Sequence, residues 1–145
     1  MFRGEYEHTI DDKGRLMIPI KFRDELGTAI VIGRGTLGQI NIYPKATFEA
    51  MEQQVEAQAG NAVYFATLLM AAANETELDR QGRVIVPPVL RRHAKLGTEA
   101  IVIGNRDHIE IWNPDEWLQT YGRLVDEYRQ QHDDLARLRE LGVRM

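Results

Sequence analysis

Two pairs of aspartate and arginine recur in this chain with the same spacing. Asp11 stands four residues before Arg15, and Asp79 stands four residues before Arg83, each time with a glycine directly before the arginine. Side chains on either side of such a tight turn can meet as an ion pair. Arginine also offers five N–H donors in a planar fork that suits phosphate groups and guanine edges. These residue types therefore suggest the recognition of charge.

Further cations stand close to the two pairs. The candidate DNA-binding residues share a positive charge in or near a turn: Arg3, Lys13, Arg15, Arg80 and Arg83. His8 is another neighbour of the first turn. We expect the aspartates to fix the turns, either within one unit of the chain or between two units. The cations either contact DNA or are solvated surface charge, and the residues alone leave both interpretations open.

The residue patterns of common catalytic and metal sites are absent from the sequence. No two of the four histidines have the spacing His-x-x-x-His, and the chain has no cysteine, no Gly-x-Ser-x-Gly motif and no phosphate-binding P-loop. Residues 33–38 match Gly-x-Gly-x-x-Gly, but we expect them to open a strand instead of a helix, which favours a hairpin loop over a nucleotide site. We expect no enzyme activity, cofactor, metal or small-molecule substrate.

The two clusters belong to a longer internal repeat. Residues 9–19 return as residues 77–87 with a constant offset, since 79 − 11 and 87 − 19 both give 68. The motif positions that the copies share are Asp11, Gly14, Pro19 and their equivalents Asp79, Gly82 and Pro87. The likeness continues from residues 26–33 to 96–104 and from 39–43 to 108–112. Each copy has only about 45 residues, where a core of its own rarely suffices, so the copies should pack together and the chain should oligomerise.

Each copy is expected to place its turn between short strands. In the first copy, residues 6–10 and 15–18 flank residues 11–14, where aspartate and glycine favour a β-hairpin, and the proline ends the second strand. The pattern then predicts a short helix over residues 20–26, a strand buried on both faces over 29–32, and a half-buried strand over 40–42. The fold class is therefore α/β in the mixed sense of α+β, with a small barrel-like sheet flanked by helices.

Additional helices are predicted outside the strands. Residues 45–73 should form two helices, of which the second is largely buried. An amphipathic stripe at helical spacing follows the second copy: Trp117, Tyr121, Leu124 and Tyr128. The predicted domain organisation is a first domain over residues 5–47, a helical connector over 48–75, a second domain over 76–119, and a C-terminal helix and tail over 120–145.

Composition indicates the cellular compartment of the protein but does not identify its function. The net charge of −4 argues mildly against a nucleic-acid binder, but a small basic patch repeated around an oligomer can still bind phosphate. No apolar run approaches the ~18 residues of a membrane span, and the N-terminus lacks the apolar core of a signal peptide. Together with the absence of cysteine, this composition predicts a cytoplasmic protein.

The motif at residues 11–19, Asp-x-Lys-Gly-Arg-Leu-x-Ile-Pro, resembles the signature of SpoVT-AbrB swapped-hairpin DNA-binding domains. The tandem copies, the opening Met-Phe-Arg-Gly and the second Asp-x-x-Gly-Arg-x-x-x-Pro make nearly the whole chain resemble the MraZ family of bacterial transcriptional regulators. Only the tail after Tyr128 is uninformative. This resemblance implies two AbrB-like β units that form a pseudo-symmetric intramolecular dimer, with hairpins swapped between the halves, and subunits that assemble into a homo-oligomeric ring.

The resemblance also implies a function. It implies sequence-specific binding of double-stranded DNA at direct repeats upstream of the division and cell wall gene cluster, with association to the nucleoid. The second turn has Gln81 where the first has Lys13, so whether both turns contact DNA stays open. The alternatives are an AbrB-like antitoxin whose C-terminal stripe, from Trp117 to Tyr128, masks a toxin, and a structural ring protein with no role on DNA.

Overall fold

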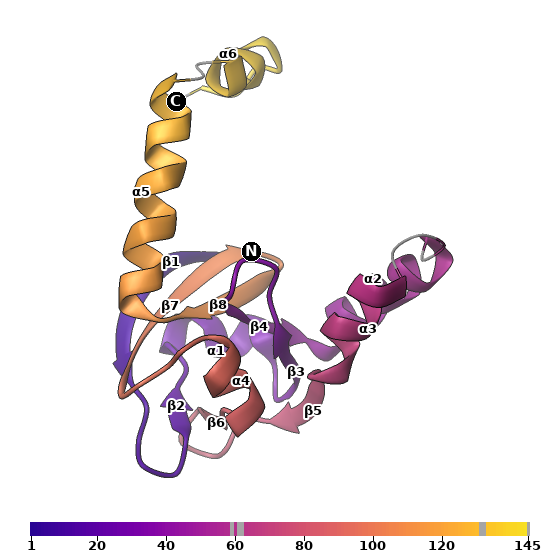
Figure 1. Ribbon diagram of the computed structural model, residues 1–145, viewed down its shortest axis with the longest axis vertical. Coiled ribbons are helices and arrows are strands. Elements are labelled where there is room, and N and C mark those ends of the chain that lie inside the picture. Colours follow the sequence, from indigo (N-terminus) through magenta and orange to yellow (C-terminus); the bar gives the residue numbers. More distant parts are fainter. Residues whose placement is uncertain (59, 61–62, 131–132, 145) are drawn as a thin grey trace. The chain divides into compact units, whose positions relative to one another are not determined.

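The structure is a computed structural model that describes residues 1–58, 60, 63–130 and 133–144 (Figure 1). It contains two compact units, Met1–Pro114 and Asp115–Met145, which are described separately below. The predicted connector and tail include residues 59, 61–62, 131–132 and 145, which lie outside the described residues. The predicted domain boundaries stay predictions.

Both copies fold into the predicted order of elements. The first copy contributes β1 (Phe2–Thr9), β2 (Arg15–Met17), α1 (Ile20–Leu26), β3 (Ala29–Arg34) and β4 (Ile40–Pro44). The second copy contributes β5 (Asn74–Glu77), β6 (Arg83–Ile85), α4 (Pro88–His93), β7 (Glu99–Arg106) and β8 (His108–Trp112). In each copy a proline follows the second strand, and the short helix starts at the residue after that proline. The mixed α+β class is therefore confirmed.

The strands of the two copies are interleaved. The large sheet has the order β1-β7-β8-β4-β3-β5, in which the first strand of each copy pairs with the third strand of the other. A second, two-stranded sheet pairs β2 with β6, one strand from each copy. If each strand is replaced by its equivalent in the other copy, the same strand orders result, read from the opposite edge. This fits the expected pseudo-symmetric arrangement. Within the first copy, β1 and β2 form only a short hairpin. Ile10 and Leu16 make one bridge, and β1 then pairs with β7 while β2 pairs with β6.

One apolar core joins the large sheet, the β2–β6 ribbon and the short helices. Leu16 and Val84 lie directly opposite each other in the ribbon, and both are buried in this core. In α1, the Phe22 ring meets the edges of two β1 rings, with centroids 5.7 Å from Phe2 and 5.4 Å from Tyr6. Because its inward residues come from both copies, the core forms only when the copies interlock.

The expectation that the strand over residues 40–42 is half-buried is wrong, because β4 is buried on both faces, as is its equivalent β8. Asn41 and Glu110, which face each other across the two strands, are buried. The Glu110 carboxylate accepts hydrogen bonds from Trp112 Nε1 at 2.9 Å and Asn105 Nδ2 at 2.9 Å, and lies 2.8 Å from His108 Nε2. Burial disfavours the Glu110 charge, but these bonds outweigh it and leave the Glu110 pKa below its usual value. A polar residue in an alternating strand can be buried when its bonds are satisfied in this way.

The same network favours the charged form of the neighbouring histidine. Burial would lower the pKa of His108, but the hydrogen bonds to Glu110 and to Asp107, each 2.8 Å long, raise it above its usual value. His108 therefore lies between two carboxylates, both of which favour the protonated form of its imidazole.

Two helices, α2 (Lys45–Gln58) and α3 (Val63–Ala71), connect the copies. In α2, Phe48 packs with Tyr43 and Val31 in a small satellite cluster on the sheet. The expectation that the second helix is largely buried is wrong, since Tyr64 is 89% and Leu68 is 54% exposed. The helix is apolar on several sides, and the chain covers only some of them.

The second unit contains α6 (Asp133–Glu140) and all of α5 (Pro114–Gln130) except its first residue. The predicted helical stripe lies on α5, where the rings of Trp117 and Tyr121 have centroids 6.0 Å apart. Among the described residues, every helix is too short or too polar to span a bilayer.

Equivalent glycines in the two copies should differ in their tolerance of alanine. A Cβ at Gly104 would lie 2.6 Å from the Phe2 carbonyl carbon in the paired strand β1, whereas a Cβ at Gly33 would meet Ala73 Cα at an ordinary 3.5 Å. We expect Gly104→Ala to lower the free energy of unfolding by about 1–3 kcal/mol, because the backbone of β1 must move. Gly33→Ala should be neutral within about 1 kcal/mol. Urea denaturation at one fixed protein concentration compares them, and equal effects would contradict the close packing of β1 on β7.

Candidate nucleic-acid interface

The first turn is organised by a single carboxylate. Asp11 Oδ1 accepts hydrogen bonds from the backbone N–H groups of Lys13 and Arg15, both at 2.9 Å, and Asp11 Oδ2 accepts one from Arg15 Nε at 2.6 Å. Gly14 has φ +78°, in the left-handed region that favours glycine. The predicted ion pair is therefore present, and it fixes the turn and the arginine together.

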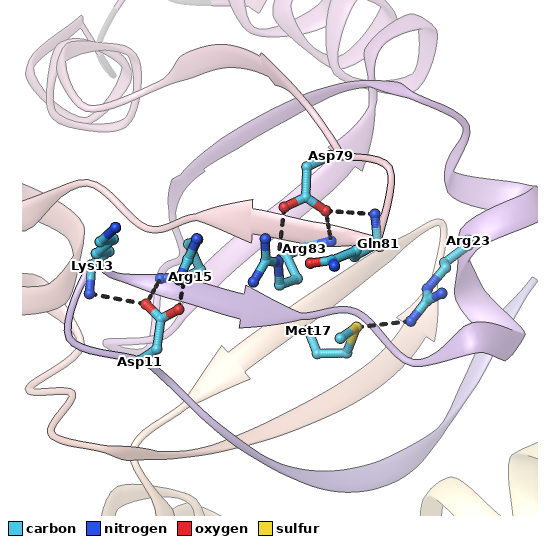
Figure 2. A network of polar contacts seen from close by, with 8 residues as sticks. All are labelled: Asp11, Lys13, Arg15, Met17, Arg23, Asp79, Gln81 and Arg83. Atoms are coloured by element: carbon cyan, nitrogen blue, oxygen red, sulfur yellow. Dashed lines mark hydrogen bonds and ion pairs between the residues drawn. The ribbon is translucent and has the colours of Figure 1, made fainter.

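The second turn repeats this geometry. Asp79 Oδ1 accepts the backbone N–H groups of Gln81 and Arg83 at 2.9 Å, and Asp79 Oδ2 accepts Arg83 Nε at 2.8 Å. Gly82 has φ +79°. Figure 2 shows both pairs, one on each of two adjacent antiparallel strands. Each pair lies within its own copy, which decides between the two arrangements left open by the sequence.

The hydrogen bonds favour the charged aspartates. In each turn the backbone N–H of the arginine lowers the carboxyl pKa most, partial burial opposes it, and the guanidinium adds to the lowering. A carboxyl pKa below its unfolded value stabilises the fold at pH values above the unfolded pKa. That contribution is lost as the pH falls through the folded pKa.

The backbones of the two turns bind the opposite copy. Val86 N–H donates to the Gly14 carbonyl at 2.8 Å, and Ile18 N–H donates to the Gly82 carbonyl at 2.9 Å. These two bonds lie outside the three residue pairs of the β2–β6 ribbon. They lengthen the contact between the two hairpins. Because each turn accepts a backbone hydrogen bond from the other copy, both cationic turns are fixed to the same two-stranded ribbon.

The β2–β6 ribbon turns its arginines outward. Arg15 lies opposite Ile85 and Arg83 lies opposite Met17, while the residues between them face the core. Since side chains alternate along a strand, both arginines occupy the outer face. Their side chains are 31% and 25% exposed.

Two arginines at the turns were missed in the reading of the sequence. Arg23 of α1 donates from Nε to the Ile18 carbonyl at 2.9 Å, and its guanidinium lies where a Cβ at Gly82 would be. Arg91 of α4 lies beside Gly14 in the equivalent place but less closely, with its guanidinium 3.4 Å from the position of a Cβ. The repeat offers a signal for both, because 91 − 23 gives the offset of 68 that relates the two turns. Each copy therefore adds a cation beside the turn of the other.

The other predicted cations are placed less uniformly. Lys13 and Arg80 are exposed in the two turns, beside Arg15 and Arg83. Arg3 lies near the start of β1, eight residues before Asp11, so the structure does not bring it to the first turn. His8 is partly buried, and burial together with the positive charge of Arg23 lowers its pKa.

The remaining sequence motif is a loop. The Gly-x-Gly-x-x-Gly segment connects β3 to β4, with Gly35 N–H donating to the Gln39 carbonyl at 2.7 Å. The Gln39 side chain accepts the Leu37 N–H at 2.8 Å and fills the turn. This is the hairpin loop favoured by the sequence.

Comparisons with known proteins converge on one family. The chain matches the family model described as "MraZ protein, putative antitoxin-like" over residues 1–66 and 69–140. A protein named transcriptional regulator MraZ from Lactiplantibacillus plantarum is 44% identical over 139 residues, which cover 94% of this chain and 96% of the relative. Proteins with the same name from Moorella thermoacetica and Pelotomaculum thermopropionicum are 41% and 38% identical, over 88% and 99% of this chain and 92% and 100% of theirs.

Removing the turn carboxylate should destabilise the fold more than neutralising it. Asp11→Ala deletes all three acceptor contacts, whereas Asp11→Asn keeps one oxygen for the backbone N–H groups. We therefore expect the melting temperature to fall in the order wild type, Asn variant, Ala variant at pH 7, with the differences shrinking as the pH is lowered through the depressed folded pKa. Differential scanning fluorimetry across pH measures this. An Ala variant that melts like the wild type would exclude a structural role for Asp11.

Proposed function

Because this chain belongs to the MraZ family, we propose that it regulates transcription by binding double-stranded DNA through the outer face of the β2–β6 ribbon. The named relatives are transcriptional regulators, and the ribbon supplies the chemistry for contact with DNA. A two-stranded β ribbon fits into the major groove, where base edges carry a distinct code of donors and acceptors.

The observation that carries this proposal is the arrangement of Arg15 and Arg83. Within each guanidinium, the aspartate accepts a hydrogen bond from Nε, and the two terminal nitrogens are not used in that bond. An arginine held at Nε and partly exposed to solvent is preorganised for a second acceptor, either guanine or phosphate. Lys13 and Arg80 extend the positive charge at the two turns.

This local charge reconciles an acidic chain with an acidic ligand. The net charge is −4, but the ribbon concentrates cations on one outward face. We infer that subunits assemble into a ring, so that several ribbons engage direct repeats on one duplex and multiply a modest single-site affinity. The exposed apolar residues of α3, which include Tyr64 and Leu68, fit such self-association.

Replacing the turn cations separates two kinds of DNA contact. Lys13→Ala should weaken binding to every sequence alike and lower the slope of log affinity against log salt by about 0.9 for each phosphate that the protein no longer neutralises. Arg15→Ala should cost about 1–3 kcal/mol per site and reduce the preference for the operator, if it binds a base edge. Fluorescence anisotropy with operator and scrambled duplexes over a salt series measures both.

The control for Lys13→Ala is Lys21→Ala, which changes an exposed lysine on α1 outside the two turn segments. It should leave both affinity and salt slope near wild type. Wild-type binding by a correctly assembled Arg15→Ala protein would remove the ribbon from the DNA interface.

The ring predicts one large species in solution. Sedimentation velocity at micromolar concentration should show a single homo-oligomer, and Leu68→Asp should shift it towards smaller species because it places a charge on the exposed face of α3. Leu37→Asp, at a similarly exposed leucine in the β3–β4 loop, is the matched control and should assemble normally. A wild-type monomer would refute the ring, and a monomer without DNA binding would favour the antitoxin alternative.

A further inference from the structure

The outer face of the ribbon carries apolar side chains between its arginines. Ile85 lies directly opposite Arg15, and Met17 lies directly opposite Arg83. Leu16 and Val84, the pair between them, are 0% and 1% exposed. The alternation of a strand therefore turns the two arginines and the two apolar residues to the same outward face.

The two apolar positions are equivalent in the repeat but differ in surroundings. Nη2 of Arg23 donates to Met17 Sδ at 2.9 Å, so the Met17 thioether is in contact with a guanidinium (Figure 2). Ile85 is 60% exposed, and it is the one large apolar side chain on the strands of the described chain that is exposed. Because the strands otherwise bury or partly bury their large apolar groups, Ile85 needs an explanation other than packing within this chain.

Its position suggests what covers it. A ribbon in the major groove would face base edges, and the apolar group that bases present there is the C5-methyl of thymine. We propose that Ile85 contacts a thymine methyl group in the major groove and thereby fixes one base of the operator. This inference rests on the proposed function and names a specificity-determining residue within the same interface.

The register also predicts where that thymine lies. Directly opposite residues of an antiparallel pair have Cβ atoms about 4.5–5.5 Å apart. Successive bases on one DNA strand rise by about 3.4 Å. The thymine should therefore lie within one or two base pairs of the position that Arg15 contacts. Met17 contacts Arg23, whereas Ile85 is exposed. The two halves of the ribbon should therefore prefer different bases. Such a preference fits a DNA site that is asymmetric and repeated in one orientation.

The test removes single methyl groups from the DNA. The full-length wild-type protein first selects its operator from random duplexes, and each thymine of one repeat is then replaced by deoxyuridine, which lacks only the methyl group. We expect one position to weaken wild-type binding about fourfold, the effect of burying roughly one methyl-sized group. The same replacement should leave the affinity of Ile85→Ala unchanged, since the two changes remove one contact.

Two further variants keep the experiment decisive. Ile20→Ala changes an isoleucine of similar type that is 77% exposed on α1 and outside the ribbon, so it should keep the wild-type sensitivity to deoxyuridine. Ile85→Val retains part of the side chain and should show an intermediate sensitivity, which also covers the case of a poorly folded alanine variant.

The outcomes distinguish this inference from the function on which it rests. Wild-type protein that prefers its operator but tolerates deoxyuridine at every position overturns the thymine contact and leaves the DNA-binding proposal standing. The same holds if deoxyuridine still weakens the binding of Ile85→Ala by the full fourfold. Protein that binds no duplex in a salt-dependent way overturns the proposed function, and the thymine contact with it.

Discussion

A carboxylate that accepts three hydrogen bonds in each turn is the constraint on which the rest of the structure depends. Asp11 binds two backbone N–H groups and one guanidinium, and Asp79 does the same in the second copy. The hydrogen bonds to the backbone N–H groups stabilise the turn, and the glycine supplies the required positive φ. The hydrogen bond to the guanidinium fixes the orientation of the arginine side chain. The geometry of the turn and the orientation of the arginine therefore have one cause, which explains why aspartate and arginine are four residues apart in both copies.

The turns in turn hold the two copies together. The Gly14 and Gly82 carbonyls accept hydrogen bonds from the opposite copy, and the ribbon buries Leu16 and Val84 in the common core. Placement of the cationic face is thus linked to global stability. A change that loosens the ribbon would disturb the core and the proposed interface at the same time, so the two effects have to be measured separately in any variant.

Much of this arrangement could be predicted from the sequence, because it rests on local rules and on the repeat. The turn residues, the proline stops and α1 follow from backbone preferences, and the offset of 68 paired the two copies. The buried Glu110 could not be predicted, since alternation alone does not reveal that Trp112, Asn105 and His108 satisfy its charge. Arg23 and Arg91 share the repeat offset, but the offset does not reveal that each arginine lies beside the turn glycine of the other copy.

The exchange of first strands between the copies also sets the order in which the chain can fold during synthesis. β1 pairs only with β7 in the large sheet, and 90 residues separate Thr9 from its partner Glu99. At about 5–20 residues per second, a ribosome needs roughly 5–20 s to deliver that partner. For that time the N-terminal strand has an unpaired edge, and strand edges of this kind pair readily with other chains. Nascent copies on neighbouring ribosomes of one messenger RNA could exchange their first strands with each other. The charged residues along β1, among them Arg3, Glu5 and Glu7, oppose such pairing until the second copy emerges.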